Sequence, residues 1–204
     1  MRHVAIVIVT LAKGGPVMVP LLICSMLSLS VIIERWGFWW RRRDVAAAER
    51  ALRLVTHAKF DEAAEIVAAS RAPGARVIAA GLQYRGAGAS QAMELVAQEE
   101  LGQARRYLPV LDTVITLSPL LGLLGTVTGM IAAFGVLSTT GMNQPNAITG
   151  GVAEALIATA VGLGIAIATL VPYNYFLAKV ERSAELMERC GSRVEQALAA
   201  DEIP

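Results

Sequence analysis

The chain has 204 residues, of which 55% are hydrophobic and 17% charged, and its formal net charge at neutral pH is +1. Its mean hydropathy is +0.54. This composition is typical of a polytopic membrane protein with a sizeable aqueous portion, and the small net charge argues against a nucleic-acid-binding protein. Cys24 lies in an apolar segment and Cys190 in a charged one, so we expect neither a mutual disulfide nor cysteine-based catalysis.

The beginning of the chain has two interpretations. Arg2 and His3 precede a short apolar run, Val4–Ala12, which resembles the hydrophobic core of a signal peptide. The run is too short to span a bilayer, and no cleavage site of small residues clearly follows it. We therefore expect residues 1–16 to form an interfacial segment on the periplasmic face, with the signal-like segment as the open alternative.

Three segments are long and apolar enough to span a bilayer, which needs about 20 mostly apolar residues. They are residues 17–40, 111–137 and 148–176. The first ends in an aromatic cluster followed by Arg41–Arg43, which is typical of a membrane interface facing the cytoplasm. The connection 138–147 is short, uncharged and rich in turn-forming residues, so the second and third spans are predicted to form an antiparallel hairpin.

The distribution of positive charge predicts the orientation of these spans. Of the 18 lysines and arginines, 12 lie between Arg35 and Arg106, four follow the third span, and two precede the first. Because positive residues concentrate on the cytoplasmic side, we expect the N-terminus to be periplasmic and the regions 41–110 and 177–204 to be cytoplasmic.

The cytoplasmic region is helical in pattern. We expect helices over Val45–His57, Phe60–Ala69 and Ala75–Arg85, with Pro73 and Gly74 ending the second of them. A helix beginning at Ser90 is expected to continue through Pro109 into the second span, and 179–200 to prolong the third span as an amphipathic helix. The predicted fold is all-α: a polytopic membrane protein with three transmembrane helices, two of them extended into the cytoplasm, plus a small cytoplasmic helical region.

A single charged residue, Glu154, occurs among the 66 residues from Thr113 to Ala178. A lone carboxylate inside a membrane is costly to bury and is by default a functional hypothesis. It is either a proton or cation station near the outer mouth, or a structural group satisfied by a neighbouring subunit or loop. Thr126 and Thr159 lie at comparable depth in the two hairpin helices, where each hydroxyl either joins a hydrogen-bond path or bonds a carbonyl of its own helix.

Small residues recur at spacings of three and four along one face of each hairpin helix, which allows close helix packing in lipid. A static helix–helix contact is the alternative to a pore lining. The residues assigned to packing or pore lining are Gly122, Gly125, Gly129, Gly151, Ala155 and Gly162. His3 and His57 are too far apart to form a metal site, and no phosphate-binding loop or catalytic motif is present. We therefore expect neither an enzyme nor a metal site, and no cofactor besides protons as the coupling ion.

Two runs of this sequence closely resemble a known family. They are LDTVITLSPLLGLLGTVTGMIAAF (111–134) and GGVAEALIATAVGLGIAIATLVPYNYF (150–176), and the family is that of the proton channels MotA, TolQ and ExbB. The three spans are similar to the TolQ/ExbB branch. By motif position, Thr126 in GLLGTVTG and Thr159 in AEALIATAVGL correspond to threonines that face a partner helix in that family, and Glu154 corresponds to the family glutamate in AEAL.

The resemblance implies a homo-pentamer in the bacterial inner membrane. Five copies would surround the single transmembrane helices of two copies of an ExbD- or TolR-like partner, whose membrane aspartate carries the proton. The implied function is that of a motor subunit that uses the proton motive force to energise TonB-dependent outer-membrane transport, acting with a TonB-like protein. A TolQ-like subunit acting with a TolA-like protein is one alternative, and a non-conducting membrane scaffold for partner helices is another. The segment before the first span is shorter than in some ExbB proteins.

Overall fold

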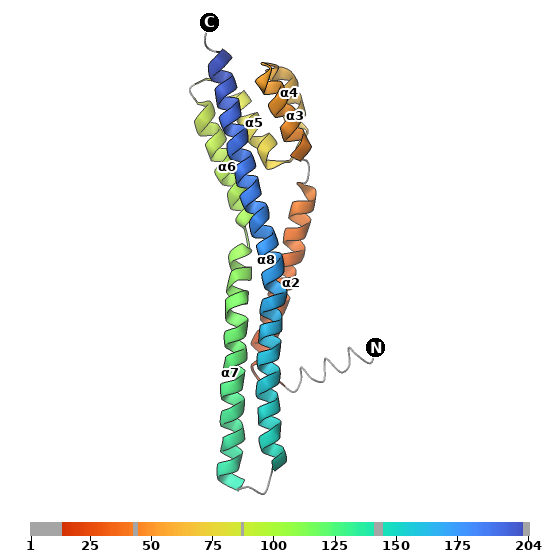
Figure 1. Cartoon of the computed structure of the whole chain (residues 1–204), viewed down its shortest axis with the longest axis vertical. Coiled ribbons are helices and arrows are strands. Elements are labelled where there is room, and N and C mark those ends of the chain that lie inside the picture. Colours follow the sequence, from red (N-terminus) through yellow and green to blue (C-terminus); the bar gives the residue numbers. More distant parts are fainter. Residues whose placement is uncertain (1–13, 43–44, 87, 141–144, 202–204) are drawn as a thin grey trace, which may run out of the picture. The chain divides into compact units, whose positions relative to one another are not determined.

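The structure is a computed structural model of the chain, and it describes residues 14–42, 45–86, 88–140 and 145–201. Every regular element in these ranges is an α-helix, so the predicted all-α fold is confirmed. Three of the helices are long and apolar enough to cross a membrane. The helices, labelled in Figure 1, are α2 (Met18–Arg41), α3 (Val45–Thr56), α4 (Phe60–Ala68), α5 (Pro73–Gln83), α6 (Ala89–Arg105), α7 (Leu108–Thr140) and α8 (Pro145–Asp201).

Several boundaries differ from those expected from the sequence. The helices α7 and α8 take up all of the predicted connection 138–147 except 141–144, which lie outside the described residues. Pro73 begins α5 instead of only ending the preceding helix, because the first turn of a helix needs no backbone N–H from proline. Most of the predicted interfacial segment 1–16 falls outside the described residues.

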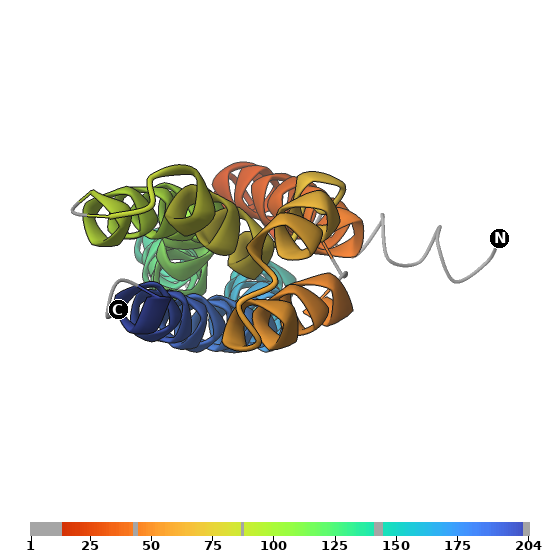
Figure 2. The same ribbon diagram turned by 90° about the horizontal axis from the view of Figure 1, so that it is seen from above.

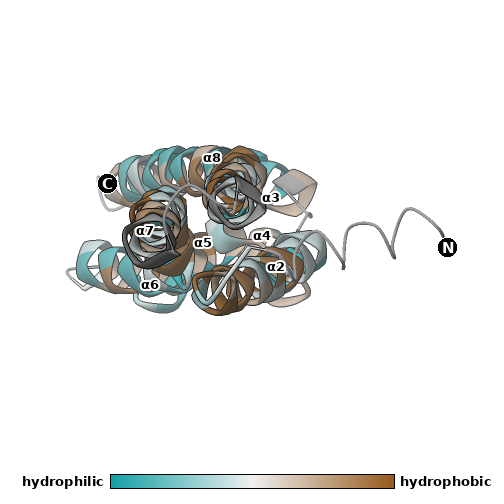
Figure 3. Ribbon diagram, turned by 90° about the horizontal axis from the view of Figure 1, so that it is seen from below, coloured by the Kyte–Doolittle hydropathy of each residue, from teal (hydrophilic) through white to brown (hydrophobic). Residues whose placement is uncertain are grey.

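The described residues form two units. The first, here called the apolar unit, contains the chain up to Ile33 together with Tyr107–Asn174, and the second, here called the bundle unit, contains Glu34–Arg106 with Tyr175–Pro204. The apolar unit thus holds most of α2, all of α7 and the first half of α8. In the hydropathy colouring of Figure 3, α2 is predominantly hydrophobic whereas α6 of the bundle unit is mostly hydrophilic.

Within the apolar unit, much of the hydrophobic surface is uncovered. Only 28% of the most apolar window of each candidate span is buried, and large side chains such as Met26 and Ile131 are 70% and 66% exposed. The start of α2 packs on the hairpin of α7 and α8 through a small cluster whose members are Val17, Met18, Leu21, Leu121, Val161 and Ile165. Exposed apolar surface of this extent is suited to lipid or to other protein chains.

The bundle unit has an aliphatic core of the kind found in water-soluble helical domains. Helices α3 to α6 pack with the C-terminal half of α8 (Figure 2) around a set of buried aliphatic side chains. Ile78 of α5 and Val194 of α8 are completely buried in this core. The predicted helices of this region therefore exist, and each is amphipathic and buries its apolar face.

The expected continuous helix through Pro109 was wrong. Helix α6 ends at Arg105, Tyr107 has a φ of 66°, and α7 begins at Leu108. Proline has no N–H for the carbonyl four residues earlier and disfavours a helical conformation in the residue before it. The helix is therefore interrupted at residues 106 and 107, and Pro109 lies in the first turn of α7, where its missing N–H breaks no helical hydrogen bond.

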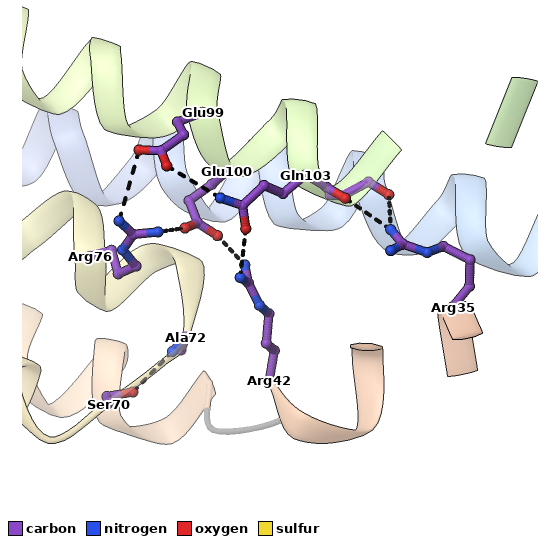
Figure 4. A network of polar contacts seen from close by, with 9 residues as sticks. Arg35, Arg42, Ser70, Ala72, Arg76, Glu99, Glu100 and Gln103 are labelled. Carbon is purple, nitrogen blue, oxygen red and sulfur yellow. Dashed lines mark hydrogen bonds and ion pairs between the residues drawn. The ribbon is translucent and has the colours of Figure 1, made fainter. Parts of the chain in front are cut away.

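A buried network of charges joins the end of α2 to α5 and α6 (Figure 4). The side chain of Glu100 is fully buried and accepts hydrogen bonds from Arg42 and Arg76. Arg42 also donates to the side-chain oxygen of Gln103 at 2.8 Å. Arg35, itself 2% exposed, donates to the backbone carbonyl of Gln103 at 2.8 Å, and the same carbonyl accepts the backbone N–H of Arg106 at 3.4 Å at the end of α6.

The rate at which Cys190 is alkylated reports on local opening of the core of the bundle unit. Cys190 is completely buried, and burial raises the pKa of its thiol to about 11. Because only the thiolate reacts, alkylation of Cys190 at pH 8 should require local opening of the bundle. We expect Ile78→Ala to cost about 2–5 kcal/mol and to accelerate alkylation of Cys190, as measured by mass spectrometry of peptides from the full-length protein. The matched control is Leu95→Ala, because Leu95 is 72% exposed. Equal acceleration by both variants would contradict the described core.

Candidate functional site

Helices α7 and α8 lie side by side (Figure 1). Their backbones approach closely where Gly122 faces Gly162. A Cβ atom added to Gly162 would lie 2.5 Å from the carbonyl oxygen of Ser118, and one added to Gly122 would lie 3.0 Å from the Cα of Thr159. Both obstacles are backbone atoms, which cannot move away by a side-chain rotation. The close packing of these helices therefore requires glycine at both positions.

The contact continues along the hairpin with other small residues. A Cβ added to Gly129 would lie 2.9 Å from the Cβ of Ala155, and one added to Gly151 would lie 2.9 Å from the Cβ of Ala133. All the small residues named from the sequence lie along this contact: Gly122, Gly125, Gly129, Gly151, Ala155 and Gly162. Their side of each helix is thus occupied within one copy of the chain, and a pore-lining role for them stays a prediction.

Thr159 links the two helices by a hydrogen bond. Its Oγ1 donates to the carbonyl oxygen of Gly122 at 2.8 Å. The absence of a side chain on Gly122 is what brings that carbonyl within reach. The hydroxyl proton is therefore engaged, while the oxygen keeps lone pairs that can accept a further hydrogen bond.

Thr126 instead bonds its own helix. Its Oγ1 donates to the carbonyl oxygen of Leu123 at 2.6 Å, which is the local alternative that threonine commonly adopts in helices. The half-buried side chain borders an apolar groove on α7, whose other lining residues are Val127, Met130, Ile131 and Phe134. Thr126 and Thr159 do not hydrogen-bond each other, because each hydroxyl donates to a backbone carbonyl.

Glu154 lies beside the start of α2. Gly15, which precedes that helix, has a φ of 71°, and a Cβ added to it would lie 1.7 Å from the Glu154 carboxylate oxygen Oε1. Gly15 is thus favoured twice, by its left-handed conformation and by the carboxylate that occupies the space of a side chain. The carboxylate contacts a segment of its own chain, and its part in proton transfer stays a prediction.

Two buried hydroxyls were not singled out from the sequence. Ser118 is completely buried, and its hydroxyl has no hydrogen-bond partner among the described residues. Thr169 is 1% exposed and donates to the carbonyl of Ile165 at 2.8 Å. Ser118 precedes Gly122 by four residues. Both Ser118 and Thr169 thus continue the spacing of the small residues along their helices. That spacing was the signal that could have identified them.

The segment containing this hairpin matches a known protein family. Residues 69–189 match the model of the MotA/TolQ/ExbB proton channel family. The chain belongs to that family. It is 35% identical over 189 residues to biopolymer transport protein ExbB-like 3 of Synechocystis sp., a match covering 89% of this chain and 90% of that relative. It is also 40% identical over 94 residues to the Tol-Pal system protein TolQ of Pseudomonas aeruginosa, which covers 46% of this chain and 41% of that protein.

A third relative also matches most of the chain. Biopolymer transport protein exbB1 of Vibrio cholerae is 34% identical over 157 residues, covering 72% of this chain and 69% of that protein. The predicted family and its ExbB/TolQ branch are confirmed. The chain is accordingly a multi-pass membrane protein of a proton-channel family, and the matched residues 69–189 include Thr126, Thr159 and every glycine of the contact between α7 and α8.

The glycine contact predicts a sharp difference between two neighbouring glycines of α8. Gly162→Ala places a methyl group against the Ser118 carbonyl, whereas nothing lies within 4 Å of a Cβ added to Gly164. We expect Gly162→Ala to destabilise the hairpin by about 1–3 kcal/mol, measured as reversible unfolding of the purified protein in mixed micelles. Gly164→Ala should leave the stability unchanged or slightly raised. Equal effects would show that the described helix contact is wrong.

Proposed function

We propose that this chain is the wall subunit of a proton-driven motor channel of the ExbB/TolQ kind. The proposal rests on the kinds of polar side chain that the hairpin contains. The family hairpin offers hydroxyl groups at Thr126 and Thr159, yet Glu154, near the start of α2, is the one charged residue from Thr113 to Ala178. Hydroxyls can relay or solvate a proton but cannot hold one at neutral pH. A partner must therefore supply the titrating group, and an ExbD- or TolR-like helix with a membrane aspartate has the required chemistry.

The hydrogen bonds of the two threonines favour the protonated form of such an acid. Each hydroxyl already donates to a carbonyl, Thr126 to Leu123 and Thr159 to Gly122. Their oxygens can accept a hydrogen bond from a neutral carboxyl group without any rearrangement. To donate to a carboxylate, either threonine must first give up its hydrogen bond to a backbone carbonyl, so the net gain is smaller. The partner's acid would therefore pass this wall neutral, carrying its proton.

A single copy of the chain is too small to enclose such a path. It has three candidate spans, each with most of its apolar window uncovered. A ring of copies would cover these surfaces and surround the partner, and membership of the family supports five copies around two partner helices. Five walls cannot contact two helices identically, so several rotational positions would have similar energies. Protonation of the partner could then bias the steps between them.

The work done would be delivered across the periplasm from the bacterial inner membrane. The relatives named ExbB favour energising TonB-dependent outer-membrane transport through a TonB-like protein. The match to TolQ of Pseudomonas aeruginosa supports a second candidate, a subunit of a Tol-Pal system acting through a TolA-like protein. In both cases the N-terminus would be periplasmic and the C-terminus cytoplasmic.

Replacement of the threonines tests the role of their hydroxyls. Thr159→Val and Thr126→Val keep the volume but remove the acceptor for the partner's carboxyl group. We expect roughly tenfold lower proton flux in vesicles containing the complete complex with its partner, since one such hydrogen bond is worth about 1–1.5 kcal/mol. Thr159→Ser and Thr126→Ser are the matched controls and should keep most of the flux.

Native mass spectrometry of the same preparations would verify that each variant still assembles with its partner. Full flux in both valine variants would favour the non-conducting scaffold. Glu154→Gln should have a mild effect if this carboxylate only supports the start of α2, and an effect as severe as the valine variants if it receives protons.

The orientation can be tested independently of proton flow. A reporter inserted at position 142 should be accessible from the periplasm, whereas reporters at positions 60 and 200 should be cytoplasmic, because positive residues are concentrated near the latter two. Accessibility would be measured with membrane-impermeant labels in intact cells and in lysed cells as the control. Labelling of position 60 from outside would overturn the proposed orientation.

A further inference from the structure

The bundle unit contains a cavity of about 550 Å³ between the end of α2, the start of α5 and one face of α8. Trp39 and Pro73 form part of its wall. The charged residues that line it are four cations and one carboxylate: Arg42, Lys179, Arg182, Arg189 and Glu185. The excess of positive charge predicts an anionic ligand.

Several of the hydrogen-bond donors around the cavity have no acceptor. The indole Nε1–H of Trp39 is buried and has no partner within the described part of the chain, and a buried donor without an acceptor is unfavourable. Arg182 forms no ion pair or hydrogen bond with another described residue, and Lys179 contacts the ring of Tyr175 at 5.7 Å. By contrast, Arg42 is already paired with Glu100. The cavity thus offers two cations and one indole N–H to an incoming acceptor.

The cavity lies at the depth expected for lipid headgroups. Trp36 stacks on Tyr175, with ring centroids 5.8 Å apart, and Trp36 is 51% exposed. Tryptophan and tyrosine concentrate at the membrane interface, at the level of the headgroups. Trp39 follows Trp36 by about one helical turn, and Lys179 follows Tyr175 by about one turn. Two different helices therefore place the cavity immediately beyond the aromatic layer, on its polar side.

We propose that this cavity binds the phosphate of an anionic phospholipid, with Lys179, Arg182 and the Trp39 indole N–H as the phosphate ligands. Pockets of about 300–1,000 Å³ accommodate small ligands, and basic pockets beside membrane helices are suited to acidic headgroups. A soluble phosphate ester offers the same oxygen acceptors. The adjoining aromatic layer favours the lipid, because it also provides an apolar surface for the first part of the acyl chains. The site shares no residue with the threonine hairpin, so it does not depend on proton conduction.

The test uses the purified full-length protein in nanodiscs or detergent. Binding of phosphatidylglycerol and of phosphatidylcholine would be compared by native mass spectrometry over a range of lipid concentrations. We expect the anionic lipid to bind more tightly, and Lys179→Gln/Arg182→Gln to lower its apparent affinity by roughly thirtyfold. The control, Arg50→Gln/Arg193→Gln, removes the same charge from residues outside the cavity and should change the affinity by less than about threefold.

Two further arms distinguish the role of the indole and the source of the phosphate. Trp39→Phe keeps an aromatic ring but removes the N–H, and it should lower the affinity by about tenfold. Glycerol phosphate at millimolar concentration should not displace the lipid. Equal binding of both lipids, or equal losses in the cavity and control variants, would overturn the proposal. Displacement by glycerol phosphate would overturn the lipid assignment in favour of a soluble phosphate ester.

Discussion

The close approach of two backbones at Gly122 and Gly162 is the constraint on which the apolar unit depends. In lipid there is no hydrophobic force that drives helices together, so their association rests on close packing and on hydrogen bonds. The glycines supply the first, and the Thr159–Gly122 bond supplies the second. Because this face of each helix is used within the chain, the rest of the helix surface remains for lipid, neighbouring copies and a partner.

The bundle unit is held together by different interactions. Its aliphatic core is that of a water-soluble domain, yet at its edge Glu100 is buried with Arg42 and Arg76. Burying a carboxylate costs several kcal/mol, and the guanidinium groups offset this cost only while both remain in place. The network therefore adds little to the net free energy of unfolding. Its main effect is to fix the geometry, because it holds the end of α2 in one position on α5 and α6. That geometry also determines where Trp39 and the basic cavity lie.

The elements that hydropathy and spacing control were predictable, and those that depend on spatial neighbours were not. Runs of apolar residues predicted the three candidate spans, and the spacing of glycines predicted the face of the hairpin that packs. The break at Tyr107 was missed, although Pro109 was a visible reason for it. The partner of Thr159 could not be predicted, because it is a carbonyl on another helix. Arg35 was counted only as a cytoplasmic charge, yet it is buried against the carbonyl of Gln103.

The distribution of charge along the chain suggests how two kinds of anion would be treated differently. Within the hairpin, Thr126 and Thr159 offer lone pairs but no cation, so a carboxylate there would lose its hydration without gaining an ion pair. Such a wall favours an acid that arrives neutral. At the edge of the bundle unit, Lys179 and Arg182 have no acidic partner among the described residues, and an anion gains full charge pairing. A phosphate, which stays ionised at neutral pH, would therefore be held at this edge and excluded from the hairpin, so the lipid and the proton would not compete.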